Sequence, residues 1–146
     1  MSEPLRIVIV EDEALIVMQL EILIEEAGHQ VVGTAASAGD AIAVARRTRP
    51  DIVFIDLQLR GGSSGLDVAK ALAEEPAMTL VFLTANARHF SDDFAGAAAV
   101  IAKPFSEAII GDTMVFLEEC IRTPPPLSAL PLGLRCAPGY LERLGT

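Results

Sequence analysis

Four apolar segments of this chain each run directly into a polar or charged residue. The segments are Leu5–Val10, followed by Glu11-Asp12-Glu13; Asp51–Ile55, followed by Asp56; Thr79–Leu83, followed by Thr84; and Ala97–Ala102, followed by Lys103. Apolar strands that alternate with helices are typical of a parallel sheet covered on both faces. Such a sheet places its ligand site at the carboxyl ends of its strands. The sequence therefore predicts an α/β fold in which these polar strand ends meet at one edge.

Helices are predicted between the strands. The first has apolar residues at helical spacing and ends at Gly28. Its apolar face consists of Ile16, Leu20, Leu23, Ile24 and Ala27. A short strand, Gln30–Ala35, follows. Three later helices begin behind serine caps and run from Ser37 to about Thr48, from Ser64 to about Glu75 and from Ser106 to about Arg122. A weak helical signal covers residues 85–96, so the predicted order is strand–helix, five times over.

The proline-rich segment Thr123–Pro126 ends this repeating pattern, since proline cannot continue a helix. We expect one domain over residues 1–122 and, over residues 123–146, a Pro-rich linker with an apolar C-terminal extension. A short helix is expected near Tyr140–Leu144. The extension is expected to pack on the domain or on a second copy of the chain as a homodimer arm, and a disordered end is the alternative.

Composition excludes several classes of protein. The chain has 146 residues, of which 51% are hydrophobic, and its net charge is −9. A single core of this size is expected to fold, and so acidic a chain without a basic patch is not expected to bind nucleic acid directly. No signal peptide and no membrane span are expected, which predicts a cytoplasmic protein. Cys120 and Cys136 lack metal-ligand spacing, and a disulfide between them stays open.

The residues at the strand ends suit phosphoryl chemistry. An aspartate carboxylate is ionised at pH 7 and can attack phosphorus once a divalent cation offsets the charge repulsion. Mg²⁺ typically takes one or two carboxylates, and we expect Asp12 and Asp56 to bind it directly and Glu11 more loosely. Lys103 and Thr84 would then contact the phosphoryl oxygens. Each residue alone could instead be a helix cap, a turn residue or an ion-pair partner; their shared position at strand ends favours the site.

Five short motifs in this order resemble the receiver domain of bacterial two-component response regulators over about residues 4–122. They are Ile9 to Glu13, Asp51 to Leu59, Ser64 to Val68, Leu83 to Ala85 and Lys103 to Phe105. The stretch Gly62–Asp67 resembles receivers of alphaproteobacterial stress signalling. The resemblance implies a flavodoxin-like (βα)5 fold, a doubly wound parallel sheet with strand order 2-1-3-4-5.

The same resemblance implies roles for individual residues. Asp56 would be the phosphoacceptor, loaded from a sensor histidine kinase or a histidine phosphotransfer protein. Mg²⁺ would bind Asp12, Asp56, the main-chain carbonyl of Gln58 and, less directly, Glu11, while Thr84 and Lys103 would bind the phosphoryl group. The Lys103–Pro104 peptide bond would be cis. The chain would catalyse only its own phosphorylation and dephosphorylation, and so would not be an enzyme in the usual sense.

Two features depart from the usual receiver. Val100 occupies a position that usually holds an aromatic switch residue. Thr84 and Lys103 are also closer in sequence than is common, so the fourth helix should be short or irregular. We therefore expect an atypical switch, with an order–disorder change over Arg88–Ala95. Asn86 and Gln58 are expected to tune the lifetime of the phosphoryl group.

No output domain follows the receiver-like segment in this sequence, which favours a stand-alone response regulator that signals by protein–protein contact or phosphorelay to an unknown target. The alternative is a degenerate receiver that acts as a phosphorylation-independent binding module, although the acids and the lysine are all retained. A haloacid-dehalogenase-type phosphatase would need a second acid where Gln58 stands. A flavodoxin would need a hydroxyl-rich phosphate loop where Glu11-Asp12-Glu13 stands.

Overall fold

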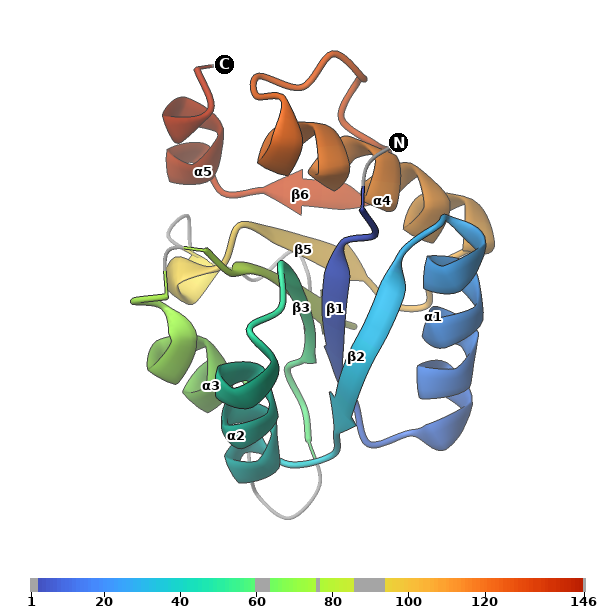
Figure 1. The fold of residues 1–146 in the computed structure, drawn as a ribbon, viewed down its shortest axis with the longest axis vertical. Helices are drawn as coiled ribbons and strands as arrows, with labels where there is room; N and C mark the ends of the chain where they lie inside the picture. Colours follow the sequence, from blue (N-terminus) through green and yellow to red (C-terminus); the bar gives the residue numbers. More distant parts are fainter. Residues whose placement is uncertain (1–2, 60–63, 76, 86–93, 146) are drawn as a thin grey trace.

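A computed structural model of the chain contains a six-stranded sheet with helices on both faces (Figure 1). The structure describes residues 3–59, 64–75, 77–85 and 94–145. The strands are β1 (Arg6–Val10), β2 (Gln30–Ala35), β3 (Ile52–Asp56), β4 (Thr79–Thr84), β5 (Ala99–Ala102) and β6 (Leu134–Cys136). The helices are α1 (Ala14–Glu26), α2 (Ala38–Thr48), α3 (Gly65–Leu72), α4 (Glu107–Arg122) and α5 (Pro138–Arg143), with a 3-10 turn, η3, at Phe94–Gly96.

The strand order is β2-β1-β3-β4-β5-β6. The first five strands pair in parallel, which confirms the predicted order 2-1-3-4-5 and the flavodoxin-like fold. The sixth strand pairs antiparallel with β5 and comes from the C-terminal extension. Three residues carry this strand, too few for a strand pattern to stand out in the sequence.

Two apolar cores lie on opposite faces of the sheet because successive side chains of a strand point to opposite faces. Ile7 and Ile9 of β1 lie in one core with buried residues of α1 and α4. Val8 and Val10 lie in the other with buried residues of α2 and α3. Strands buried on both faces explain why they appear in the sequence as continuous apolar runs.

Serine caps begin three of the helices, as predicted. The Ser37 hydroxyl accepts a hydrogen bond from the Asp40 amide, that of Ser64 from the Leu66 amide and that of Ser106 from the Ile109 amide. Helix α3 ends at Leu72, earlier than the predicted Glu75. Ala27, which falls on the predicted apolar face, is exposed, because α1 ends at Glu26 and Ala27 is its C-cap.

The C-terminal extension packs on its own chain. Residues 123–133 return along α4, where the carboxylate of Glu119 accepts hydrogen bonds from the amides of Leu127 and Ser128, each at 2.7 Å, and from the Ser128 hydroxyl at 2.5 Å. Beyond β6, the Ala137 amide donates to the Ala98 carbonyl at 2.8 Å. The expected short helix is α5, which begins at Pro138. The domain boundary at residue 122 stays a prediction, because β6 continues the sheet across it.

Three further expectations concern the Lys103–Pro104 peptide bond, the cysteines and membrane-spanning helices. The Lys103–Pro104 peptide bond is cis, as is Pro124–Pro125. Cys120 and Cys136 are both free thiols. In the part of the chain that the structure describes, no helix combines the length and apolarity needed to cross a membrane.

Candidate functional site

The carboxyl ends of β1, β3, β4 and β5 bring the predicted site residues to one edge of the sheet. Parallel register places Val10 opposite Ile55, Asp56 opposite Leu83 and Thr84 opposite Ala102. Glu11 and Asp12 follow β1 directly, and Lys103 follows β5. The sheet topology therefore joins residues that lie up to 92 positions apart in sequence, the separation of Glu11 and Lys103.

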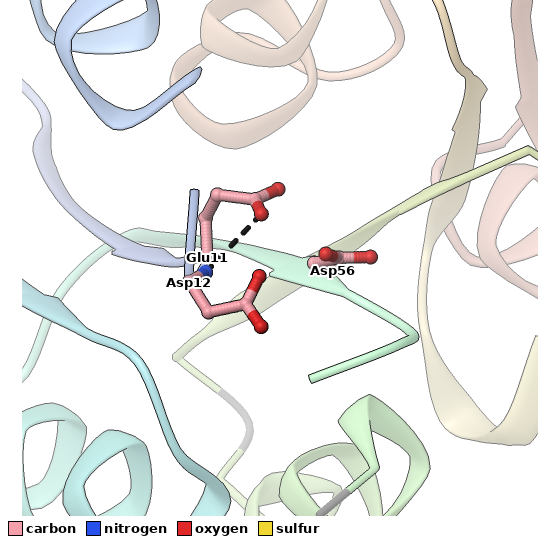
Figure 2. A group of neighbouring side chains, drawn as sticks. All are labelled: Glu11, Asp12 and Asp56. Atoms are coloured by element: carbon pink, nitrogen blue, oxygen red, sulfur yellow. Dashed lines mark hydrogen bonds between the residues drawn. The ribbon is translucent and has the colours of Figure 1, made fainter. Parts of the chain in front are cut away.

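Three carboxylates form the centre of this site. Glu11, Asp12 and Asp56 each offer an oxygen, and these oxygens all lie within 4.8 Å of one another. Figure 2 shows the three side chains converging from the ends of β1 and β3. Glu11 is 2% exposed and Asp56 is 6% exposed, so two of the three carboxylates are almost out of solvent. Clustered carboxylate oxygens are the donors that Mg²⁺ prefers, so the residues present fit this ion.

Lys103 neutralises part of this negative charge. Its Nζ lies 2.9 Å from Glu11 Oε2 and 3.2 Å from Asp56 Oδ2. Burial alone would lower the pKa of Lys103, but the hydrogen bond to Glu11 and the charge of Asp56 outweigh it and raise the pKa. The lysine therefore stays protonated between the two acids.

Two backbone amides and Lys103 orient the carboxylate of Glu11. Its Oε1 accepts hydrogen bonds from the backbone amides of Asp12 and Glu13, each at 3.1 Å. Burial raises the pKa of Glu11 to about 7, although the hydrogen bond from Lys103 acts in the opposite direction. Glu11 therefore exchanges a proton near neutral pH.

The main chain around Asp56 is closely packed. The Gln58 amide donates to Asp56 Oδ1 at 3.1 Å, and the Gly65 amide donates to the Leu57 carbonyl at 3.0 Å. A Cβ atom at Gly65 would lie 2.4 Å from the Asp56 carbonyl oxygen, so only glycine allows α3 to begin this close to β3. Gly65 was noted in the sequence only as part of a motif; nothing in its spacing indicates this contact.

Thr84 and Lys103 are neighbours through the backbone as well as through the site. Thr84 is 3% exposed at the end of β4, and the Lys103 amide donates to the Thr84 carbonyl at 2.8 Å. Val100, at the expected switch position, is buried in β5 opposite Arg135 of β6. Asn86 and the segment 88–93 of the expected switch lie outside the described residues.

Comparison with known proteins places this geometry in a family. The sequence pattern of the response regulator receiver domain matches residues 7–114. The phyllosphere-induced regulator PhyR of Methylorubrum extorquens is 37% identical over 122 residues, which make up 80% of this chain and 46% of PhyR. The transcriptional regulatory protein PdtaR of Mycobacterium tuberculosis is 36% identical over 106 residues, 70% of this chain and 51% of PdtaR. The chain thus spans about half the length of these curated relatives.

Solved structures agree with the sequence relatives. The PhyR receiver domain of Erythrobacter litoralis has a TM-score of 0.70 at 27% identity and covers 88% of this chain, with 97% of its own length matched. The response regulator PhyR of Brucella abortus has a TM-score of 0.66 at 30% identity, over 80% of this chain and 49% of its own. These relatives support the alphaproteobacterial subgroup suggested by Gly62–Asp67. The chain belongs to the response regulator receiver domain family.

Proposed function

We propose that this chain is a response regulator that accepts a phosphoryl group on Asp56, in a Mg²⁺-dependent reaction, from a phosphohistidine of a sensor kinase or phosphotransfer protein. The observation that supports this most directly is the cluster of Glu11, Asp12 and Asp56, with Lys103 Nζ 3.2 Å from the Asp56 carboxylate. A buried aspartate beside two further acids and a lysine has the groups that phosphoryl transfer needs.

In the proposed step, an Asp56 carboxylate oxygen attacks phosphorus. An O–P bond forms, the P–N bond of the phosphohistidine breaks, and the imidazole nitrogen keeps the electron pair and takes up a proton. Mg²⁺, when bound, would offset the negative charge of the carboxylates and the phosphoryl oxygens. Glu11, Asp12, Asp56 and the main-chain carbonyl of Gln58 would hold the ion.

Lys103 and Thr84 are proposed to bind the phosphoryl oxygens. The Lys103 ammonium lies between Glu11 and Asp56, so a short movement along this edge brings it to a group on Asp56. Thr84 ends the neighbouring strand and carries a hydroxyl donor. Both contacts strengthen as negative charge builds up on the transferred group, which is how positioning lowers the barrier.

The output is proposed to be a protein contact or a phosphorelay rather than direct binding to nucleic acid, given the net charge of −9. One structural relative, from Bartonella quintana, is named an anti-anti-sigma factor. Only 50% of that relative is matched, so the receiver reaction is what the shared part supports. A homodimer through the extension stays a prediction that light scattering with and without residues 124–146 would test.

Intact-mass measurement after incubation with acetyl phosphate and Mg²⁺ tests the proposal. Wild type should gain the mass of one phosphoryl group, and Asp56→Asn should gain none. Asp112→Asn, an exposed acid on α4, is the matched control and should react as wild type does. Omission of Mg²⁺ should abolish the adduct. An unmodified wild-type protein, with Mg²⁺ present, would instead favour the degenerate binding module.

A further inference from the structure

The C-terminal arm, defined as residues 127–145, is held along the strand that leads to Lys103. Leu134, Arg135 and Cys136 pair with Ile101, Val100 and Ala99 of β5. Lys103 is two residues beyond Ile101 and pairs with Glu11 and Asp56. Strand β5 therefore pairs with the arm along one edge and leads directly to Lys103 of the site.

A second contact joins the arm to Phe94 of η3. The Arg135 guanidinium lies 5.1 Å from the centre of the Phe94 ring, a stabilising cation–π distance. Phe94 is 1% exposed and has a φ of 51°, and Ala95 has the same φ. Residues other than glycine rarely adopt this left-handed conformation, so contacts such as that with Arg135 must stabilise it.

Hydrogen bonds to Glu119 anchor the start of the arm at Leu127 and Ser128, whereas few of the arm's side chains are buried. Leu134 and Ala137 are 4% and 5% exposed, and Pro131 is the third buried residue of the arm. Helix α5 has no buried residue, and Tyr140 and Leu141 are only half-buried against the cores. A three-residue edge strand with few buried contacts has a low free energy of local opening compared with the central strands. Local opening of β6 and α5 therefore requires less free energy than opening of the five-stranded sheet.

We propose, resting on the proposed phosphorylation of Asp56, that the arm is a dissociable cover of the β5 edge and that phosphorylation releases it. The docked arm occurs together with the Lys103–Glu11 pair at 2.9 Å. A phosphoryl group on Asp56 draws Lys103 away from Glu11 and shifts the end of β5, which disfavours the pairing that begins at Ile101. Release uncovers the β5 edge and the apolar surface beneath Leu134.

Coupling of this kind is reciprocal. If phosphorylation weakens arm docking, then an undocked arm must favour the phosphorylated geometry by the same factor. This reciprocity allows the inference to be tested from both directions on the full chain, with beryllofluoride and Mg²⁺ as the probe of the phosphorylated state.

Cys136 is a natural reporter of arm opening. It lies in β6, and burial raises the pKa of its thiol to about 12, so reagents that need a thiolate should react slowly while the arm is docked. Alkylation at Cys136, followed by peptide mapping, should accelerate by at least about tenfold when beryllofluoride and Mg²⁺ are added. Asp56→Asn should show no acceleration.

Two variants in the arm test the reverse direction. Leu134→Asp places a charge at a 4% exposed position and should speed Cys136 alkylation without beryllofluoride and tighten beryllofluoride binding, measured by calorimetry, by a matching factor. Leu132→Asp, two residues away and 96% exposed, should leave both unchanged.

The outcomes separate the two proposals. Beryllofluoride binding with an unchanged Cys136 rate overturns arm release and leaves phosphorylation of Asp56 standing. No beryllofluoride binding and no phosphoryl adduct overturn both. Equal effects of Leu134→Asp and Leu132→Asp would also overturn arm release, because they would trace the change to added charge rather than to a lost contact.

Discussion

Glu11 combines the deepest burial of the three acids with direct contact to a cation. Burial raises its pKa to about 7 even though Lys103 Nζ lies 2.9 Å away. Two carboxylates and one ammonium would otherwise leave the buried site with an uncompensated negative charge, which is costly at low dielectric. A proton on Glu11 relieves that cost.

Mg²⁺ affinity should therefore depend on pH near neutrality. As pH falls through about 7, Glu11 gains a proton that Mg²⁺ must displace, so binding should be about tenfold weaker at about pH 6 than at about pH 8. Calorimetric titrations at the two pH values measure this. Glu11→Gln should bind more weakly at both and lose most of the pH dependence. If Mg²⁺ affinity of Glu11→Gln depends on pH as in wild type, a group other than Glu11 causes the pH dependence.

His29 links acid pH to stability. His29 is buried, and its Nδ1 accepts a hydrogen bond from the Leu5 amide at 3.0 Å. Burial lowers the pKa of His29, although the negative charge of Glu118 acts in the opposite direction. The pKa of His29 in the folded protein lies below the unfolded value of about 6.5. Its contribution to the free energy of unfolding is therefore present above that pH and is lost as pH falls through the folded pKa. Urea unfolding at several pH values should show the decline, and His29→Gln should reduce it. An identical decline in the variant would contradict this role.

At the scale of elements, the start of α3 packs directly against the end of β3. A Cβ atom at Gly65 would lie 2.4 Å from the Asp56 carbonyl oxygen and 2.9 Å from the Leu57 Cα. Gly65→Ala must push the helix and the Asp56 strand apart. We expect a loss of about 1–3 kcal/mol in the free energy of unfolding, as for overpacked cores, and slower phosphorylation by acetyl phosphate.

Gly111 is the matched control for this substitution. It lies inside α4, and a Cβ atom there would meet no atom within 4 Å. Gly111→Ala should raise the free energy of unfolding by about 0.5–1 kcal/mol, because alanine favours the helix more than glycine does. The rate of phosphorylation should stay unchanged. Denaturant unfolding of both variants measures the two changes in the free energy of unfolding. If both changes have the same sign, the close contact of Gly65 with Asp56 does not explain the effect of Gly65→Ala.

Strands and caps could be predicted because their signals are local. Apolar runs gave the five parallel strands, and serines gave three helix starts. Strand β6 could not be predicted in this way: its pattern of Leu134, Arg135 and Cys136 is too short, and its pairing depends on where the chain returns along α4. The contact of Gly65 with Asp56 depends likewise on packing between elements, which no local pattern records.

For the whole molecule, the sheet order could be predicted from the resemblance, and the convergence of the acids and Lys103 on one edge could be predicted from their places at strand ends. The pairing of Lys103 with Glu11 was not predicted, because the sequence was interpreted for the phosphorylated state, in which the lysine contacts the phosphoryl group. Burial and charge, which decide this pairing, become visible only once the side chains are placed.

Whole-chain stability should respond to Mg²⁺ through this site. An ion that binds the folded state and not the unfolded chain stabilises by mass action, by about 2.7 kcal/mol at a hundredfold excess over its Kd. Mg²⁺ should thus raise the midpoint of thermal unfolding. The net charge of −9 means that any salt reduces general repulsion, so NaCl at matched ionic strength is the necessary control. The excess of Mg²⁺ over NaCl should vanish in Asp12→Asn. An equal rise with both salts would mean that the three carboxylates do not hold the ion, because screening alone would account for the stabilisation.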